Sequence, residues 1–265
     1  MLRSLSILNP LAALLCGVVL VRADLVATPL RQPGSPLDVS LSHEADRAVR
    51  QAANWLCMRQ NPDGSWGTTQ RVTLTALALT ALAASPHPED HNARSLGALW
   101  LGQSTTRSLS SLGEHAWRLL ALSLSLPDTP ERSAYLQDLA RRVPPVAASS
   151  VDDRRFYEEV LAQAGIGAQP APDAESTELA ARAAAIWPPP LSRSRAAWRL
   201  ARLINRTAGG RLAHGQTSLD WRSHLAAWLI STQKNAPEGG GFWSAETADA
   251  QLAETAYGIL CLLEL

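Results

Sequence analysis

The sequence predicts an all-α protein, and three observations support this fold class. From about residue 44 onward, apolar residues recur at intervals of three and four, which is the period of an amphipathic helix. Alternating runs rich in Val, Ile or Thr, which would indicate strands, are almost absent. A helix–turn–helix pattern also occurs near both ends of this region. Together these features favour helical hairpins that bury their apolar faces on one another.

The periodic segments predict ten helices in chain order. We expect them near residues 44–60, 71–84, 92–103, 113–124, 130–142, 152–164, 174–186, 192–205, 218–233 and 248–264. Turn-forming or proline-rich stretches separate several of them, such as "NPDG", "SPHPED" and "WPPPLS" at 187–192. Nothing resembles an interdomain linker between residues 44 and 265. These residues therefore predict a single domain.

Composition limits the classes of partner. The chain has 265 residues, of which 46% are hydrophobic and 18% charged, as in globular proteins. Its 24 basic and 24 acidic residues cancel, so no net field favours nucleic acid or an anionic membrane.

The first residues predict an export signal over 1–23. Arg3 provides a positive start, "LAALLCGVVLV" a short apolar core, and Val21-Arg22-Ala23 a small-residue cleavage site. Residues 24–43, with three prolines up to Pro36, predict a flexible leader. An uncleaved N-terminal anchor is the alternative, whereas Leu15 argues against lipidation at Cys16. We expect a periplasmic or secreted product with no transmembrane span after cleavage.

The two helix–turn–helix segments share a motif. The first is "AANWLCMRQNPDGSWG" and the second is "LAAWLISTQKNAPEGGGFW", and each leads into an Ala/Leu-rich helix. Each has a Trp five residues before a Gln, then a Gly-rich turn and a second Trp. The motif residues are Trp55, Gln60, Gly64 and Trp66 in the first copy, and Trp228, Gln233, Gly240 and Trp243 in the second. A weaker copy begins at "GALWLGQ", with Gln103.

The chemistry of this motif indicates a structural brace. The glycines permit the backbone angles of a tight connection. The Gln amide is suited to the unpaired backbone groups at the end of a neighbouring helix, and the Trp covers that polar contact with a large apolar surface.

These two motifs resemble the QW-type repeats of squalene–hopene cyclases and protein prenyltransferases. The chain is most similar to small exported bacterial proteins that contain a prenyltransferase/squalene-oxidase repeat. The resemblance implies an α/α toroid, in which inner helices surround a cavity and outer helices pack behind them. Ten helices would form about five hairpins of such a ring.

The catalytic motifs of these families are not retained. Terpene cyclases of this class use an Asp-rich DxDD motif, but the adjacent Asp152 and Asp153 have the wrong spacing and precede two arginines. Ser150 as a helix N-cap, with both aspartates in the first turn, explains the pair structurally. Protein prenyltransferases bind zinc through Asp, Cys and His, and neither Cys57 nor Cys261 has an Asp at a suitable offset. We expect no cofactor.

Three polar residues of the predicted inner helices are the catalytic candidates, because they could reach a central cavity. These are Glu114, His115 and Glu254. A Glu–His pair is suited to acid–base chemistry. The alternative is that the carboxylates simply occupy the solvated ends of their helices.

A metal site is a second hypothesis. Asp220 and His224 share a helix face, and His214 precedes them in a loop, a donor set that suits zinc. The alternative is that Ser218 or Asp220 caps the helix and His224 pairs locally with the carboxylate.

Cys57 and Cys261 lie on the first and last predicted helices, which would be neighbours in a closed ring. A disulfide between them is one interpretation, and two buried free thiols are the other. Five further tryptophans remain for packing or for a pocket: Trp100, Trp117, Trp187, Trp198 and Trp221.

The sequence therefore predicts an exported, non-catalytic binding or interaction module. Its partner would be an apolar or partly apolar small molecule in the cavity, or an envelope protein at the surface. A divergent toroid enzyme, similar to a terpene cyclase or a polysaccharide lyase, is the alternative. A purely structural role would require a ring too tightly filled to hold a ligand.

Overall fold

The computed structural model describes residues 37–85, 87, 90–104, 111–142, 150–167, 174–185, 191, 193–207, 212–214 and 217–265. The described part of the chain is all α, as predicted, and contains ten helices. Their bounds are α2 Val39–Met58, α3 Arg71–Ala84, α4 His91–Gln103, α5 Leu112–Ser125, α6 Pro130–Arg141, α7 Val151–Gln163, α8 Ala174–Ala185, α9 Ser194–Thr207, α10 Trp221–Thr232 and α11 Ala248–Glu264. The predicted export signal and Trp187 lie outside the described residues.

The helix starts follow from capping side chains. The Ser111 hydroxyl accepts from the Glu114 amide at α5, and Ser150 accepts from the Asp153 amide at α7. The prediction that Ser150 caps this helix is thereby confirmed. The first helix begins at Val39 rather than at 44, because Asp38 caps it by accepting from the Ser40 amide.

Two short antiparallel hairpins differ from the expectation that no strand would matter. Strands β1 Leu212–His214 and β2 Thr217–Leu219 pair with each other, and so do β3 Lys234–Asn235 and β4 Gly241–Phe242. The predicted helix start at 218 is therefore wrong. The backbone is still extended at Leu219, and α10 begins only after Asp220, whose side chain caps it.

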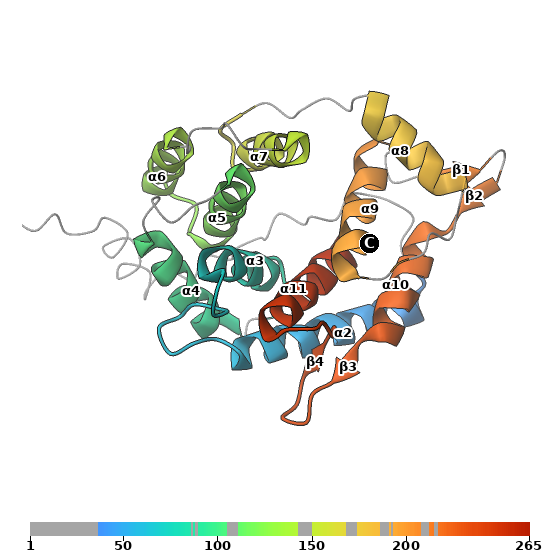
Figure 1. Ribbon diagram of the computed structural model, residues 1–265, viewed down its shortest axis with the longest axis horizontal. Helices are drawn as coiled ribbons and strands as arrows, with labels where there is room; N and C mark the ends of the chain where they lie inside the picture. The colour runs from blue at the N-terminus through green and yellow to red at the C-terminus, as the bar shows by residue number, and fades with distance from the viewer. Residues whose placement is uncertain are drawn as a thin grey trace, which may run out of the picture.

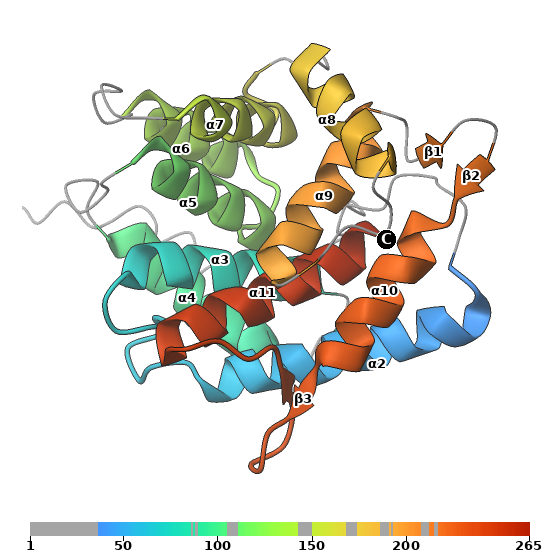
Figure 2. The same ribbon diagram turned by 45° about the vertical axis from the view of Figure 1, so that its right-hand side comes forward.

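The helices form two groups by their contacts. The odd-numbered helices pack on one another in series: α7 on α5, α5 on α3, α3 on α11 and α11 on α9. The even-numbered helices lie against this series, with α4 on α3 and α5, α6 on α5, α8 on α9, and both α2 and α10 on α11. Figures 1 and 2 show α3 and α11 side by side between the green α5 and the orange α9.

Helices α3 and α11 are buried almost all the way around. Ala and Leu occupy consecutive positions in α3, so that Leu77, Ala78 and Leu79 all lose nearly all contact with solvent. A helix that is apolar on every side is stable only between other elements. This explains why these two helices occupy the centre of the packing order.

The first motif acts as a brace between α2, α3 and α4. The Trp66 indole Nε1 donates to the Leu56 carbonyl of α2 at 2.7 Å, and the Trp66 amide donates to Thr75 of α3 at 2.9 Å. The Gln60 amide Nε2 donates to the carbonyls of Gly64 and of Ala93 in α4, both at 2.9 Å. The motif thus ties one hairpin together and joins it to the next.

The second motif repeats these bonds around α10, α11 and α2. The Trp243 indole Nε1 donates to the Leu229 carbonyl of α10 at 2.9 Å, and its amide donates to Thr255 of α11. The Gln233 amide donates to the Ala48 carbonyl at 2.9 Å. The helix that receives this last brace is α2, the first of the described helices.

The turn glycines have matching positions in the two braces. A Cβ on Gly64 would lie 2.6 Å from the Leu96 carbonyl oxygen of α4, and a Cβ on Gly240 would lie 2.9 Å from the Gln51 carbonyl oxygen of α2. Both glycines also have positive φ. Only a residue without a side chain allows these turns to approach the neighbouring helix so closely.

Two other motif residues have a different role from the one expected. Trp55 stacks on Phe242 of β4 at a centroid distance of 5.5 Å, so it joins the first hairpin to the last. Trp228 lies partly exposed on α10. A further clasp forms where the Asp249 carboxylate at the start of α11 accepts from the amides of Thr68 and Thr69, both at 3.0 Å.

We predict that Gln60→Ala lowers the free energy of unfolding by about 1–2 kcal/mol, because two carbonyls lose their donor. Gln103→Ala is the matched control, since Gln103 ends α4 and is exposed, and it should change stability by less than about 0.5 kcal/mol. Urea denaturation measures both variants. Equal effects would show that Gln60 is not a brace.

We predict that Gly240→Ala is more destabilising than Gly239→Ala. Both residues have positive φ, but a Cβ at Gly239 would meet nothing within 4 Å. Gly239→Ala should therefore cost only the backbone strain, about 1 kcal/mol. Gly240→Ala should add about 1–3 kcal/mol from the clash with α2. Thermal or urea unfolding of the pair tests this, and equal losses would contradict the close approach.

Candidate functional site

A cleft of about 450 Å³ lies among the odd-numbered helices. The first turns of α3 and α5, the first half of α7, and residues along the length of α9 line it, together with Tyr257 of α11 and Leu179 of α8. This volume falls within the range of small-molecule sites. The cleft combines this volume with a lining of aromatic and charged side chains, and it is the candidate functional site.

Aromatic side chains from four helices meet in this cleft. The Trp117 ring of α5 lies 4.8 Å from Phe156, 5.4 Å from Trp198 and 5.9 Å from Tyr257, measured between ring centroids. Trp198 and Tyr257 are 5.2 Å apart. We call these four residues the aromatic floor. Stacked and edge-on rings at such distances stabilise one another and present a rigid apolar surface.

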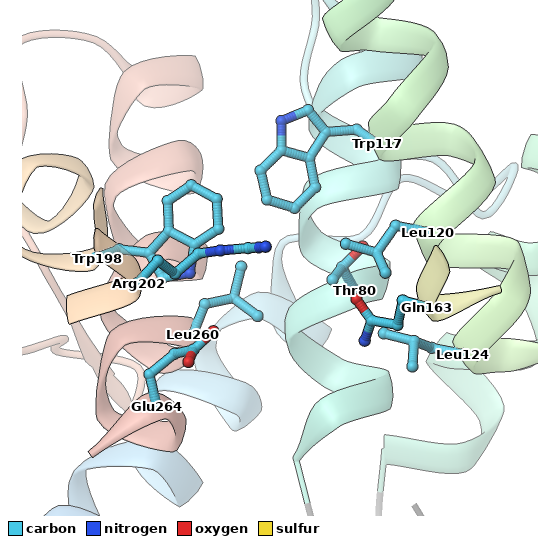
Figure 3. A pocket seen from close by; sticks show the side chains of 9 residues that line it. All are labelled: Thr80, Trp117, Leu120, Leu124, Gln163, Trp198, Arg202, Leu260 and Glu264. Carbon is cyan, nitrogen blue, oxygen red and sulfur yellow. The ribbon is translucent and has the colours of Figure 1, made fainter. Parts of the chain in front are cut away.

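A second, much smaller space of about 10 Å³ lies beside the floor. Trp117, Trp198 and Arg202 line both spaces, whereas Thr80, Gln163 and Glu264 line only the smaller one. Figure 3 shows the Arg202 guanidinium between the two Trp rings and the side chains of Leu260 and Glu264. This space has room for about one water molecule, so the aromatic floor closes the larger cleft at this point.

Helix α9 supplies a row of arginines to the cleft. Arg195, Arg199, Arg202 and Arg206 all line it, and their spacing of four, three and four residues places them on one helix face. Arg202 stacks over the Trp198 ring at 5.0 Å and the Phe156 ring at 5.5 Å. We call these four residues the arginine row.

One buried carboxylate joins α7 to this row. Glu159 is 6% exposed and accepts a hydrogen bond from Arg202 at 2.6 Å, and it also forms an ion pair with Arg206. Helices α7 and α9 are not among the pairs of helices with extensive contact. Ionic bonds therefore contribute to this junction, in contrast to the apolar packing between α3 and α5.

Of the three catalytic candidates, Glu114 lines the cleft. It lies in the first turn of α5, and the Thr73 hydroxyl of α3 donates to its Oε1 at 2.8 Å. Since a carboxylate at this place faces the cleft, it could contact a ligand directly.

His115 and Glu254 lie elsewhere. His115 is fully buried and packs on the Tyr157 ring at 5.7 Å, away from the cleft-lining residues. Burial, and secondly the charge of Arg118, lower its pKa to about 4. The Glu254 carboxylate accepts from the Ser194 amide at 2.6 Å, so it binds the start of α9. The expected Glu–His pair is therefore not formed at the cleft.

The proposed metal ligands do not form a cluster among the described side chains. Asp220 caps α10 by accepting from the Ser223 amide at 3.2 Å, and His224 lies one turn further along. The His214 backbone pairs with Thr217 in the β1–β2 hairpin, but its side chain lies outside the described part. Within the described residues, no group of three His, Cys, Asp or Glu side chains could hold a metal ion.

Both cysteines are free thiols in the structure. Cys261 is fully buried in α11, and the Cys57 thiol donates to Asp90 at 3.5 Å. Burial raises the pKa of Cys57 to about 12, so it is a thiol rather than a reactive thiolate.

Sequence reasoning missed the arginine row and singled out Trp117 and Trp198 only as members of a larger set. The signal for the row was present in "SRAAWRLARLINRT", where arginines repeat with helical spacing around Trp198. Such a stripe is also typical of a solvated helix face. Its place in the cleft depends on how α9 packs against α11, which the periodicity does not specify.

Comparison of the chain with protein-family models, with curated proteins and with solved structures finds no match. None of the described helices is both long enough and apolar enough to span a membrane.

We predict that stability falls on acidification because of His115. Its folded pKa of about 4 lies below the ordinary value of 6.5, so the unfolded chain takes up the proton first. The stabilisation is present above pH 6.5 and is lost as the pH falls towards 4. Between pH 7.5 and pH 5.0 this group alone should cost about 2 kcal/mol.

The measurement is urea unfolding of the wild type and of His115→Phe at both pH values. The variant should lose less stability between them, whereas His43→Gln, an exposed position on α2, should behave as the wild type. Identical pH dependence in all three proteins would contradict the buried neutral imidazole.

Proposed function

We propose that this chain is a ligand-binding module with an α/α-toroid arrangement. Two features support the arrangement. The odd-numbered helices contact one another in series. In addition, Gln233 of the last brace donates a hydrogen bond to α2, just as Gln60 of the first brace donates one to α4. Hairpins that follow one another around an axis would place the last hairpin beside the first, as the second brace requires.

The proposed ligand is a small molecule that is at least partly apolar. The observation that carries this proposal is the aromatic floor at the base of a cleft of about 450 Å³. Leu179 adds an apolar group on one wall, and it is 44% exposed. A cleft with an apolar base and polar walls is the usual form of a small-molecule site. A tightly filled ring with a purely structural role would not leave this space.

The place of action in this proposal is outside the cytoplasm, either the periplasm or the medium. The support is the export signal expected over residues 1–23, and no other observation bears on it. An envelope protein at the surface remains the second kind of partner that the sequence favours.

A divergent toroid enzyme is the second candidate function, and one observation favours it. Glu114 is a carboxylate that lines the cleft on the side of Trp117. General acid–base catalysis requires such a group within reach of the ligand. A compound that co-purifies with the chain would separate the two functions. Its conversion by the wild type but not by Glu114→Gln would support an enzyme, and its recovery unchanged from both would support a binding module.

The binding proposal is tested with N-phenyl-1-naphthylamine, an uncharged aromatic probe whose fluorescence rises in an apolar site. We expect saturable binding to the purified full chain. Leu179→Ala should weaken this binding about three- to tenfold, since part of a leucine side chain is removed from contact with the probe. Leu96→Ala is the matched control, because Leu96 on α4 is 40% exposed and does not line the cleft. The absence of saturable binding, or equal effects of the two variants, would overturn the proposal.

A further inference from the structure

The cleft carries an excess of positive charge that the chain as a whole does not have. Five arginines line it, namely the arginine row and Arg155 of α7, against the three carboxylates of Glu114, Asp153 and Glu159. Among the described lining residues, guanidinium groups therefore exceed carboxylates by two. The net charge of the full sequence is zero, so the excess is a local property of this cleft.

The arginine row divides into two halves with different environments. Arg202 and Arg206 share the buried Glu159 carboxylate. Arg195 and Arg199, one helical turn apart, are exposed on the same face. Burial of Glu159 gives the first half a structural role, whereas an exposed guanidinium on a cleft wall contributes little to stability.

The exposed half lies next to the aromatic floor. The Arg195 guanidinium is 5.8 Å from the centroid of the Tyr257 ring, and Trp198 lies on α9 between Arg195 and Arg199 in sequence. A ligand whose apolar body rests on Tyr257 and Trp198 would therefore have its edge beside two guanidinium groups. Guanidinium forks bind carboxylate, sulfonate and phosphate oxygens through paired, charge-assisted hydrogen bonds.

We propose that the ligand of this cleft is an amphipathic anion, with its apolar body on the aromatic floor and its acidic group at Arg195 and Arg199. This inference rests on the proposed binding function and specifies the chemical class of its ligand. It identifies Arg195 and Arg199 as the residues that determine specificity for charge. The exposed positions leave both side chains accessible from solvent.

The test uses two probes that differ by one sulfonate group. 8-Anilinonaphthalene-1-sulfonate has the same aromatic body as N-phenyl-1-naphthylamine and carries one additional sulfonate. We expect the anionic probe to bind the full chain at least about tenfold more tightly at low salt. The advantage should shrink as sodium chloride is raised towards 0.5 M, because salt screens exposed charges, while the affinity of the neutral probe should stay nearly constant.

The double variant Arg195→Gln/Arg199→Gln should abolish the advantage of the anionic probe and leave the affinity for the neutral probe within about twofold. The control is Arg47→Gln/Arg50→Gln, which removes two exposed arginines of α2 that do not line the cleft. Circular dichroism before each titration confirms that the variants are folded. The control should bind both probes as the wild type does.

The outcomes separate this inference from the proposed function. Equal affinity of the two probes would overturn the anion site and leave the apolar cleft in place. An anionic advantage that persists in the cleft variant, or disappears in the control, would assign the anion contact to another surface and also overturn it. Failure of both probes to bind would overturn the binding function itself.

Discussion

The hydrogen bond from a turn Trp indole to a carbonyl of the helix that precedes the turn is the interaction on which the rest of this fold depends. In the α2–α3 and α10–α11 hairpins it fixes the angle at which the chain folds back, and the neighbouring Gln then fixes the distance to the next helix. Because these donors are held inside apolar surroundings, a misplaced hairpin would leave buried carbonyls without partners, at a cost of about 1–3 kcal/mol each. Through these hydrogen bonds, the two turns set the relative positions of α2, α4 and α10.

The cleft arises from the packing of a different set of helices. Helices α3, α5 and α11 are held together by apolar side chains, and their packing brings Trp117 and Tyr257 into the same cluster as Trp198 and Phe156. Between α7 and α9 the Glu159 ion pairs bridge the two helices instead. The site therefore combines a rigid base, fixed by packing, with walls of charged side chains that retain more freedom. Recognition of a ligand would draw on both properties.

The number and approximate positions of the described helices could be predicted from the sequence, whereas the arrangement of side chains in the cleft could not. The helix at 71–84 and the helix ending at 264 were predicted to the residue, since the first is a run of helix-forming Ala and Leu residues and the second begins at the capping side chain of Thr247. The roles of Gln60 and Trp66 also followed from local chemistry. The separation of His115 from Glu114 did not, because adjacent residues on a helix point in directions about 100° apart and only the packing of α5 decides which one faces the cleft. The contact of Trp55 with Phe242 could not be predicted either, because the two residues are far apart in the sequence.

The bond between Gln233 and Ala48 joins residues 185 positions apart. During synthesis, α2 is made before the α10–α11 hairpin. Yet only that hairpin provides the donor to the Ala48 carbonyl of α2 and occupies the space next to Gln51. These contacts with α2 can form only after residues 233–243 have left the ribosome, and contacts of such sequence separation slow folding. In a nascent chain, the side of α2 that carries the Ala48 carbonyl consequently stays uncovered until the α10–α11 hairpin has been made.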